Sequence, residues 1–304
     1  MTGIYSPSVV YCVLREKIPQ VRSVIPLTLF SSVLLGVIQG VTEFLPVSSS
    51  GHLAIAEHLL NISGASEVPP FFDVLLHLGT LFAVFIAYWA DIRDMILEFF
   101  HGVGDLVHGT TPSRVPPARR MILLIIAGTL PLFAVLPAKD AIEGLGDNMY
   151  FVAFALLATG CLLFASDRVR RGRKTEKSAT MLDALLVGVG QAVATCPGIS
   201  RSGTTITAGC FVGFERKFAV RYSFLMSIPA ILGANILSLK DALEAQVLWE
   251  EVPVYLVGVA VSAMVGYLCI RLIKLVADKG KFGFFAYYCW LAGIVTLALI
   301  FTQT

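Results

Sequence analysis

The chain is poor in charged residues. Lys, Arg, Asp and Glu together make up 14% of its 304 residues, whereas about 25% is usual in soluble domains. The formal net charge is +2, which gives no reason to expect nucleic acid as a partner, and we predict none. Hydrophobic residues account for 56% of the sequence, and the mean hydropathy is +0.79. This composition predicts an integral membrane protein.

Cysteine is scarce and scattered. The cysteines show neither a CxxC pair nor a regular spacing, which argues against a disulfide framework and against a cysteine metal site. They are Cys12, Cys161, Cys196, Cys210, Cys269 and Cys289, and we interpret them as small, buried side chains. No small-residue cleavage site follows segment 1–26, so a signal peptide is not expected. We interpret residues 1–26 as an N-terminal extension, with an interfacial helix as one option.

Six apolar stretches are long enough to cross a bilayer as helices, for which about 20 residues are needed. They lie near residues 71–90, 119–137, 149–166, 218–239, 252–271 and 284–302. Two further apolar stretches, 27–60 and 181–215, are interrupted by Pro, Ser and Gly. We predict that each of these two forms a re-entrant helix pair, which enters the membrane, turns and leaves on the same side. The expected fold is an all-α integral membrane protein with six transmembrane helices and two re-entrant helix pairs.

The loop charges predict an orientation, because cytoplasmic loops carry an excess of Lys and Arg. The basic segments are 91–120, 168–177, 215–221 and 271–282, whereas 138–148 and 240–252 hold one basic residue each among several acids. These two kinds of segment alternate as six spans require, and they put the C-terminus outside. The basic residues of segment 1–26 would also lie outside, which is the one discordant point.

One sequence occurs twice in the chain. Residues 34–52 read LLGVIQGVTEFLPVSSSGH, and residues 186–204 read LVGVGQAVATCPGISRSGT, a shift of 152 positions and thus half of the chain. Each copy places Ser, Gly and Pro inside apolar sequence. Irregular backbone of this kind is costly in lipid unless it is buried in protein or lines a wet cavity. The repeat therefore predicts the location of a functional site.

Three predicted spans separate the two copies. An odd number of crossings makes the two re-entrant pairs enter from opposite faces, which is an inverted-topology repeat. Folds of this kind place their site near the membrane midplane, where broken helices meet. We predict one membrane domain over residues 27–304, made of inverted repeats at about 27–166 and 181–304.

The first copy combines acidic, hydroxyl and imidazole groups. Gln39 and Glu43 are four residues apart and would share one face of a helix, and a carboxylate within membrane sequence indicates function. Pro46 would end that helix. A new helix is expected near Gly51, with His52 in its first turn, and its N-terminus and hydroxyls would form an anion site with Ser48, Ser49 and Ser50.

The second copy has a different charge. Pro197 and the following glycine would break the helix, and a hydroxyl-rich run follows with Ser200, Arg201, Ser202 and Thr205. Arg201 is the only strongly basic residue between Lys177 and Arg216. A guanidinium among hydroxyls at a helix N-terminus suits a phosphate group, which it can bind bidentately.

Other polar residues have simpler interpretations. Small residues in membrane helices commonly serve close packing, but packing alone does not explain Glu, His and Arg within matching copies of one motif. Asp73 and His77 lie four apart near the start of a span, and they either face the same cavity or are interfacial. For His58, His101 and His108, near segment ends, we expect solvated positions.

Both runs are similar to signatures of the undecaprenyl pyrophosphate phosphatase family, of the bacitracin-resistance type. QGVTEFLPVSSSGH resembles the first signature, an (E/Q)xxxE element followed by a serine-rich turn and a histidine. PGISRSGTT resembles the second, PGxSRSxxT. The resemblance covers the chain from about residue 27, and it implies six spanning helices and two re-entrant helix pairs in an inverted repeat.

The resemblance implies hydrolysis of undecaprenyl pyrophosphate to undecaprenyl phosphate and inorganic phosphate. This undecaprenyl-diphosphatase activity recycles the lipid carrier for cell-wall polymers and underlies tolerance of bacitracin. The resemblance also implies a divalent cation, Mg²⁺ or Ca²⁺, for which we expect Glu43 and Gln39 as ligands. Some members carry a glutamate in place of Gln39. An amide cannot act as a base and is a weaker metal ligand, so acid–base chemistry falls on Glu43 or His52.

The motif positions carry the expected roles. The catalytic residues would be Ser49, His52, Glu43 and Arg201, and the phosphate ligands would be Ser48, Ser50, Ser200, Ser202 and Thr205. Two nucleophiles stay open. Ser49 could attack with His52, three residues on, as its base, or His52 could attack directly and form a phosphohistidine.

The expected partners are a long-chain prenyl pyrophosphate lipid and the bilayer, and a homo-oligomer stays open. The expected location is the cell membrane, with several spans and the active site open to the outer face. The residues also leave open a transporter or flippase of a phosphate-bearing lipid, because inverted repeats with broken helices are typical of secondary carriers. That alternative does not explain why a histidine, a glutamate and a serine gather beside the anion site.

Overall fold

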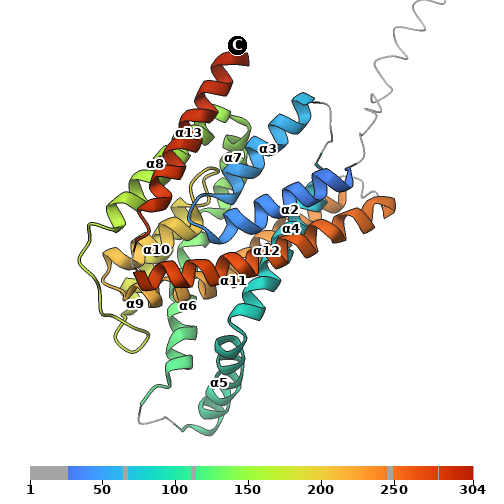
Figure 1. Cartoon of the computed structure of the whole chain (residues 1–304). Coiled ribbons are helices and arrows are strands. Elements are labelled where there is room, and N and C mark those ends of the chain that lie inside the picture. Colours follow the sequence, from blue (N-terminus) through green and yellow to red (C-terminus); the bar gives the residue numbers. More distant parts are fainter. Residues whose placement is uncertain (1–26, 64–67, 111–113, 245–248, 280, 304) are drawn as a thin grey trace, which may run out of the picture.

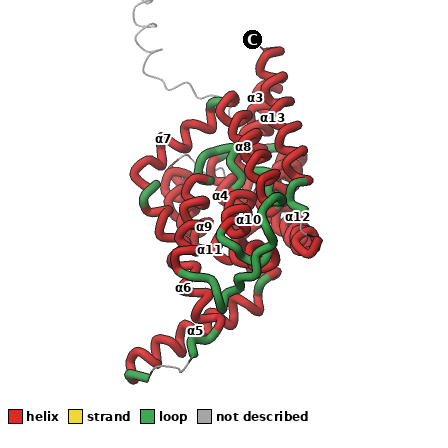
Figure 2. The backbone as a smooth tube through the Cα atoms, turned by 90° about the vertical axis from the view of Figure 1, so that its left-hand side faces the viewer, coloured by secondary structure: helices red, strands yellow, loops and turns green. Residues whose placement is uncertain are grey.

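A computed structural model of the chain describes residues 27–63, 68–110, 114–244, 249–279 and 281–303. Over these residues the fold is helical (Figures 1 and 2), and one isolated β-bridge joins Lys174 to Phe214. The interpretation of residues 1–26, and of Cys12 within them, lies outside the described part of the chain.

The first half of the described chain begins with two helices that flank the first motif turn. They are α2 (Leu29–Phe44), α3 (Ser49–Ser63), α4 (Pro70–Ala87), α5 (Trp89–His108), α6 (Pro117–Phe133), η1 (Leu136–Ala138), α7 (Lys139–Glu143), η2 (Gly144–Asp147) and α8 (Met149–Ser166). The second half again begins with two helices that flank a motif turn, and three longer α-helices follow. It holds α9 (Met181–Val193), α10 (Arg201–Phe211), α11 (Arg216–Glu244), η3 (Trp249–Glu251), α12 (Val252–Lys279) and α13 (Phe284–Gln303).

Six helical segments of the described chain are long and apolar enough to cross a membrane. They are Pro70–Ala87, Pro117–Asp147, Met149–Ser166, Arg216–Leu239, Trp249–Lys279 and Phe284–Thr302. Each coincides with one of the six predicted spans, so the chain is a multi-pass membrane protein. The helices of the two interrupted stretches are shorter, because Pro and Gly break each stretch at the repeated motif.

Helix α5 is a structural element that the loop assignment for residues 91–120 missed. Its polar residues recur at helical spacing, at Asp94, Glu98 and Asp105, so one face of the helix is charged. Arg119 of α6 pairs with this face, with Nε 2.7 Å from Glu98 Oε1 and Nη2 2.6 Å from Asp105 Oδ2. The hydrogen bond from Arg119 lowers the pKa of the Asp105 carboxyl below its ordinary value. The charges explain why α5 was not expected as a span.

The duplication is visible in the order and packing of the helices. A broken helix pair followed by three spanning segments occurs twice. The first helix of each pair packs through equivalent glycines. A Cβ on Gly36 of α2 would lie 2.5 Å from the carbonyl oxygen of Gly258 in α12, and Gly188 of α9 meets the backbone of Gly128 in α6 even more closely. That the pairs enter from opposite membrane faces stays a prediction.

The two motif turns contact each other in the middle of the chain's fold. A Cβ on Gly51 would lie 3.0 Å from Gly198 Cα, and one on Gly203 would lie 3.2 Å from Pro46 Cβ. Gly51 and Gly203 are repeat equivalents, and each packs against the turn of the other copy. The absence of a side chain at both positions therefore lets the two helix N-termini approach each other.

Aromatic packing supports the end of α2 that carries Glu43. The neighbouring Phe44 is 1% exposed and meets Phe224 of α11 edge to face, with ring centroids 5.4 Å apart. Phe224 in turn packs against Tyr88 at 6.1 Å. This cluster joins α2, α4 and α11, and it holds the first helix of the broken pair against two spanning helices.

Candidate active site

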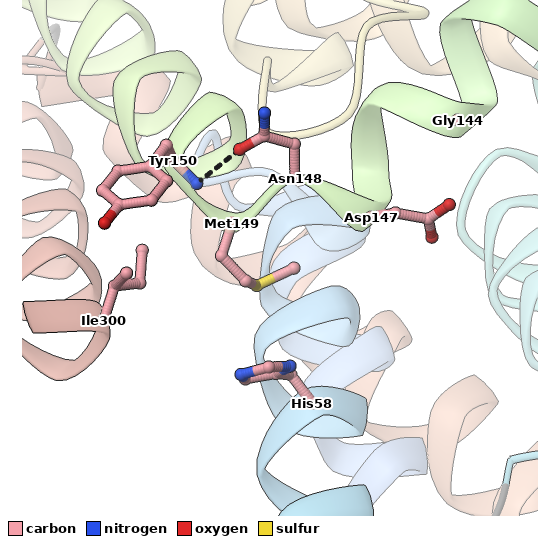
Figure 3. Close-up of a pocket in the computed structure, with 7 residues that line it drawn as sticks. All are labelled: His58, Gly144, Asp147, Asn148, Met149, Tyr150 and Ile300. Atoms are coloured by element: carbon pink, nitrogen blue, oxygen red, sulfur yellow. Dashed lines mark hydrogen bonds between the residues drawn. The ribbon is translucent and has the colours of Figure 1, made fainter. Parts of the chain in front are cut away.

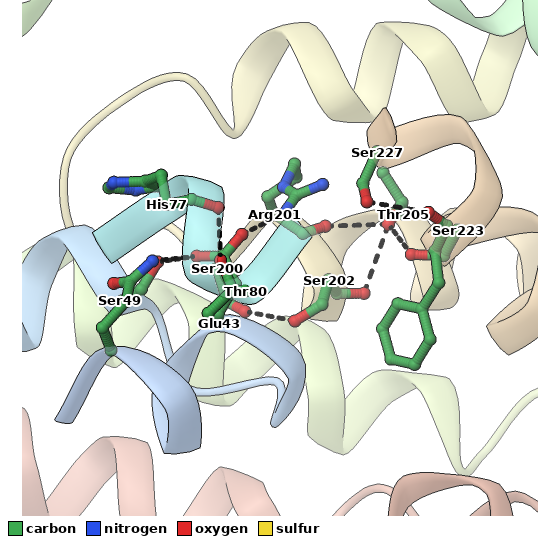
Figure 4. Close-up of polar contacts among 12 residues, drawn as sticks. Glu43, Ser49, His77, Thr80, Ser200, Arg201, Ser202, Thr205, Ser223 and Ser227 are labelled. Atoms are coloured by element: carbon green, nitrogen blue, oxygen red, sulfur yellow. Dashed lines mark hydrogen bonds and ion pairs between the residues drawn. The ribbon is translucent and has the colours of Figure 1, made fainter. Parts of the chain in front are cut away.

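Glu43 lies at the centre of the site (Figure 4). Its carboxylate is buried and accepts three hydrogen bonds, which come from both copies of the motif. Gln39 Nε2 donates to Oε2 at 3.2 Å and Ser49 Oγ donates to the same oxygen at 2.6 Å. Arg201 Nη2 forms an ion pair with Oε1. The acidic and basic residues that sequence analysis assigned to separate copies therefore meet in space.

Local backbone geometry places Ser49 at the start of α3. Helix α2 ends at Phe44, two residues before Pro46, which cannot continue it. Ser48 then adopts a positive φ of 76°, which no other non-glycine residue of the described chain does. Its Oγ accepts the backbone N–H of Gly51 at 3.3 Å, as a helix cap does. Ser49 is consequently the first residue of the new helix, and its hydroxyl reaches back to Glu43.

The second copy repeats this cap. Ser200 is the N-cap of α10, and its Oγ accepts the backbone N–H of Gly203 at 3.1 Å. Arg201, the first residue of α10, thus corresponds to Ser49 in the first copy. The N-termini of α3 and α10 both lie beside Glu43, and exposed N–H groups at helix starts favour anions. The site combines one carboxylate, one hydroxyl and one guanidinium with two such N-termini.

Two equivalent serines connect the two turns. Ser50 Oγ accepts the backbone N–H of Gly198 at 3.3 Å, and Ser202 Oγ donates to the carbonyl oxygen of Leu45 at 3.3 Å. Each also lies near its own capping serine, at 3.4 Å between Ser48 and Ser50 and at 3.3 Å in the second copy. That these serines bind phosphate stays a prediction. In the structure they form hydrogen bonds between the two copies of the motif.

Thr205 lies one turn inside α10 and faces the protein. Its Oγ1 donates to the carbonyl oxygen of Arg201 at 2.8 Å and lies 2.6 Å from Ser223 Oγ of α11. These contacts fix the first turn of α10 against a spanning helix. The phosphate contact predicted for Thr205 is likewise untested.

His52 is held away from Ser49. Its Nδ1 lies 2.7 Å from the carbonyl oxygen of Ser48, and its Nε2 lies 2.8 Å from the hydroxyl of Tyr288 in α13. The two rings stack with an interplanar angle of 11°. Both ring nitrogens are therefore engaged, and the hydroxyl of Ser49 is bonded to a carboxylate instead of to the imidazole.

His77 joins the site from α4. Figure 4 shows it beside the cluster of Glu43 and Ser49. Its Nδ1 lies 3.0 Å from the carbonyl oxygen of Asp73 and 3.7 Å from the Asp73 side chain. The Asp73 side chain is 43% exposed, so it lies toward the edge of the site.

Three residues of the site carried no recognisable signal in the sequence. Thr159 of α8 accepts the N–H of Ser200 at 3.1 Å and donates to the carbonyl oxygen of Gly198 at 3.3 Å. Tyr288 contacts His52, and Ser223 contacts Thr205. All three are single hydroxyl residues in apolar spans. Spacing along the chain does not distinguish them from residues that serve helix packing.

The structure contains a cavity of about 500 Å³, which Figure 3 shows. It is lined by His58 near the end of α3, by Asp147 and Asn148 before α8, and by Tyr150 and Ile300 among others. The predicted catalytic and phosphate-binding residues do not line it. Its position shows that the far end of α3 lies beside the acidic segment 138–148.

The donor set around Glu43 fits a cation that is held mainly by phosphate. Within the described residues, His, Cys, Asp and Glu side chains form no group of three that could hold a metal ion. Gln39 Oε1 is buried and has no hydrogen-bond partner, because the amide nitrogen faces the acceptor-only carboxylate of Glu43. One carboxylate and one free amide oxygen match Mg²⁺, which uses few protein ligands together with substrate phosphates.

Comparison with known proteins identifies the family. A model of the family described as bacitracin resistance protein BacA matches residues 32–295. A protein named undecaprenyl-diphosphatase from Methanosphaera stadtmanae is 40% identical over 279 residues, which cover 90% of this chain and 98% of that protein. Proteins of the same name from Alkaliphilus metalliredigens and Halothermothrix orenii are each 39% identical, over 89% of this chain and 98% of their own length. The chain, with both motifs joined at Glu43 and Arg201, belongs to the BacA family.

Proposed function

We propose that this protein hydrolyses undecaprenyl pyrophosphate to undecaprenyl phosphate and inorganic phosphate. Family membership and the relatives named undecaprenyl-diphosphatase support this activity. The structural observation that carries the proposal is the contact of Ser49 and Arg201 with one buried carboxylate, Glu43. By this activity the protein would recycle the lipid carrier for cell-wall polymers and confer tolerance of bacitracin.

The geometry favours Ser49 as the nucleophile. A serine hydroxyl is a weak nucleophile unless an adjacent base takes its proton. Ser49 Oγ donates to Glu43 Oε2 at 2.6 Å, so the proton has an acceptor in place. Oγ would bond to the terminal phosphorus, the bond from that phosphorus to the bridging oxygen would break, and undecaprenyl phosphate would leave. Water would then hydrolyse the phosphoserine and release inorganic phosphate.

Arg201 is suited to hold the phosphates and to offset their charge. A guanidinium has five N–H donors in a planar fork, and the ion pair with Glu43 uses Nη2. The remaining donors, with the N–H groups at the starts of α3 and α10, are available to phosphate oxygens. Such contacts strengthen as charge develops in the transition state.

The rival nucleophile is His52, through a phosphohistidine. Its two ring nitrogens bond to Ser48 and Tyr288, so attack would require that one of these hydrogen bonds break. Trapping the phosphorylated enzyme and finding the acid-labile phosphate on His52 would overturn the assignment of Ser49.

Glu43 and Gln39 are the residues that we propose would hold a divalent cation. Both are buried, and Gln39 Oε1 is the free oxygen donor. When bound there, Mg²⁺ or Ca²⁺ would neutralise phosphate charge and polarise phosphoryl oxygens. The chain itself supplies the proton acceptor, the hydroxyl and the guanidinium.

We further propose that the protein lies in the cell membrane and that the first re-entrant pair opens to the outer face. The loop charges put segment 138–148 outside. The cavity lined by His58 and Asp147 places the end of α3 beside that segment. The pyrophosphate head would thus enter from the outer side while the prenyl tail stays in lipid.

The test is phosphate release from a long-chain prenyl pyrophosphate by the detergent-purified protein, in Mg²⁺ and in EDTA. We expect cation-dependent release that Ser49→Ala, His52→Ala and Arg201→Ala each reduce strongly. The alternative is an inverted-repeat carrier, since duplicated broken helices are typical of secondary transporters, but the family and the named relatives favour the enzyme. Saturable binding of the lipid without phosphate release by the unsubstituted protein would support the carrier over the enzyme.

A further inference from the structure

Tyr288 of α13 contacts a functional group that lies 236 positions away in the sequence. Its hydroxyl lies 2.8 Å from His52 Nε2, and the two rings stack with centroids 5.5 Å apart. Tyr288 is 44% exposed, and among the described residues its hydroxyl bonds to His52 alone. The contact therefore gives a half-exposed tyrosine a specific polar partner.

The hydrogen-bond chemistry defines which nitrogen of His52 carries its proton. A backbone carbonyl can only accept, so the contact of 2.7 Å with the oxygen of Ser48 requires a hydrogen on Nδ1. In the neutral ring Nε2 is then an acceptor, and the hydroxyl of Tyr288 donates to it. Tyrosine is also an acceptor, so the same contact survives when the ring takes up a second proton.

The Ser48 carbonyl is itself held in place. The positive φ of Ser48 turns its backbone, and the same carbonyl oxygen accepts the N–H of His52 at 3.3 Å. The imidazole is therefore fixed on one side by the turn and on the other side by Tyr288. Ser49 lies between Ser48 and His52 in the sequence, and its hydroxyl is free to bond to Glu43.

The start of α13 is also anchored by hydrogen bonds, which fixes the position of Tyr288 along the helix axis. Asp167, after α8, accepts the backbone N–H groups of Phe282 and Gly283 at 3.0 and 2.7 Å. Arg216 of α11 pairs with the same carboxylate at 3.2 Å. Tyr288 follows about one and a half turns later on a helix with a capped start, so its hydroxyl is well positioned.

We propose that Tyr288 is a positioning residue for the reaction, and this proposal rests on the proposed function. It holds His52 with a proton on Nδ1 and keeps Nε2 as the nitrogen that accepts or releases a proton during turnover. The hydrogen bond at one ring nitrogen governs which nitrogen of a histidine carries the proton. The Ser48 carbonyl sets it here, and Tyr288 holds the ring in that orientation. Loss of the hydroxyl leaves the ring stacking in place but allows the imidazole to rotate and change tautomer.

The neighbouring Tyr287 offers a matched control. It is also on α13 and is 61% exposed, but it packs on Phe164 and Trp290 instead of on a polar group. Tyr287→Phe and Tyr288→Phe therefore remove the same atom from adjacent positions. Equal thermal unfolding of the two purified variants would show that neither has lost its fold.

The experiment combines turnover with nitrogen-15 NMR of histidine-labelled full-length protein in detergent, with His52 assigned by its loss in His52→Asn. We expect Tyr288→Phe to lower kcat roughly tenfold with little change in KM, as for the loss of one hydrogen bond. Its pH–rate profile should also shift, while Tyr287→Phe remains like the unsubstituted protein. In the latter, the NMR signal of His52 should report a proton on Nδ1.

Two results would overturn the proposal. One is a proton on Nε2 as the main neutral form of His52 in the unsubstituted protein. The other is a Tyr288→Phe protein whose kcat and His52 signal equal those of Tyr287→Phe. If the unsubstituted protein releases no phosphate, the proposed function fails, and the NMR comparison still decides whether Tyr288 holds His52.

Discussion

Arg201 and Glu43 form an ion pair between the two copies of one duplicated motif. The Glu43 side chain is 4% exposed and that of Arg201 is 22% exposed. Each copy alone would leave a charge in an apolar environment, at a high cost in free energy. Each copy therefore supplies part of the site, and the charge that each carries is neutralised only by the charge of the other copy.

Replacing Ser49 with Ala should abolish phosphate release, by at least about 10³-fold. The nucleophile would be gone, while the pair of Glu43 and Arg201 would remain and still bind the lipid. Steady-state release and a filter-binding assay with the same lipid would separate the two effects. Thr195→Ala is the control, because Thr195 occupies the position equivalent to Glu43 in the second copy and is exposed. Normal phosphate release by Ser49→Ala would instead indicate His52 as the nucleophile.

Removing Arg201 should cost both activity and stability. Arg201→Ala is expected to lower kcat by about 10³-fold, as for other phosphoryl clamps. It also leaves the buried carboxylate of Glu43 unpaired, which typically costs about 3–5 kcal/mol. Because Arg201 is partly exposed, we expect the lower end of this range in a thermal or denaturant unfolding experiment.

The double variant separates these two effects of Arg201. Glu43→Gln removes the unpaired charge, so Arg201→Ala with Glu43→Gln should recover most of the lost stability while remaining inactive. A double-mutant cycle of unfolding free energies measures this coupling. A double variant that is as unstable as the sum of the single ones would show that the ion pair contributes little.

Gln39→Glu should alter the dependence on divalent cations. Gln39 Oε1 is buried, unpartnered and close to Glu43, so a second carboxylate would add charge to the proposed cation site. We expect half-maximal activity at a lower Mg²⁺ concentration than in the unsubstituted protein. EDTA should abolish phosphate release by both proteins. If titration with Mg²⁺ gives the same midpoint for both, the amide is not a ligand.

Close packing through glycine should limit substitution at Gly36 and Gly188. A Cβ at Gly36 would lie 2.5 Å from the backbone of Gly258, so Gly36→Ala and Gly188→Ala should lower stability by about 1–3 kcal/mol, as overpacking does. Gly104→Ala is the control, since nothing lies within 4 Å of the added carbon, and alanine is the better helix former by about 1 kcal/mol. Thermal unfolding in detergent compares all three.

Much of the fold was predictable because its causes are local. Hydropathy over about 20 residues predicts a span, and all six predicted spans are present. Pro46 and Pro197 predict the breaks, and the serines predict new helix starts, which begin at Ser49 and Arg201. Helix α5 was missed because its several charged residues, which recur at helical spacing, are typical of a segment outside the membrane.

The site was predictable in its composition but not in its contacts. The motifs predict a site with Glu43, Ser49, His52 and Arg201, and all of them lie at the junction of the two turns. The spacing of three residues on one helix offers His52 as a base for Ser49. In the structure Ser49 bonds to Glu43 across the break, because the turn at Ser48 directs its hydroxyl back toward α2.

The sequence by itself determined that this is a membrane protein, where its helices lie, and which chemical groups stand at the two breaks. Those properties depend on hydropathy, on proline and glycine, and on capping, all of which act within a few residues. Only the tertiary structure decided that Arg201 pairs with Glu43, that Thr159 binds the second turn, and that Tyr288 holds His52. Such partners lie 41 to 236 positions apart. They meet because glycines let the helices approach closely, and the spacing of residues along the chain does not predict which helices do so.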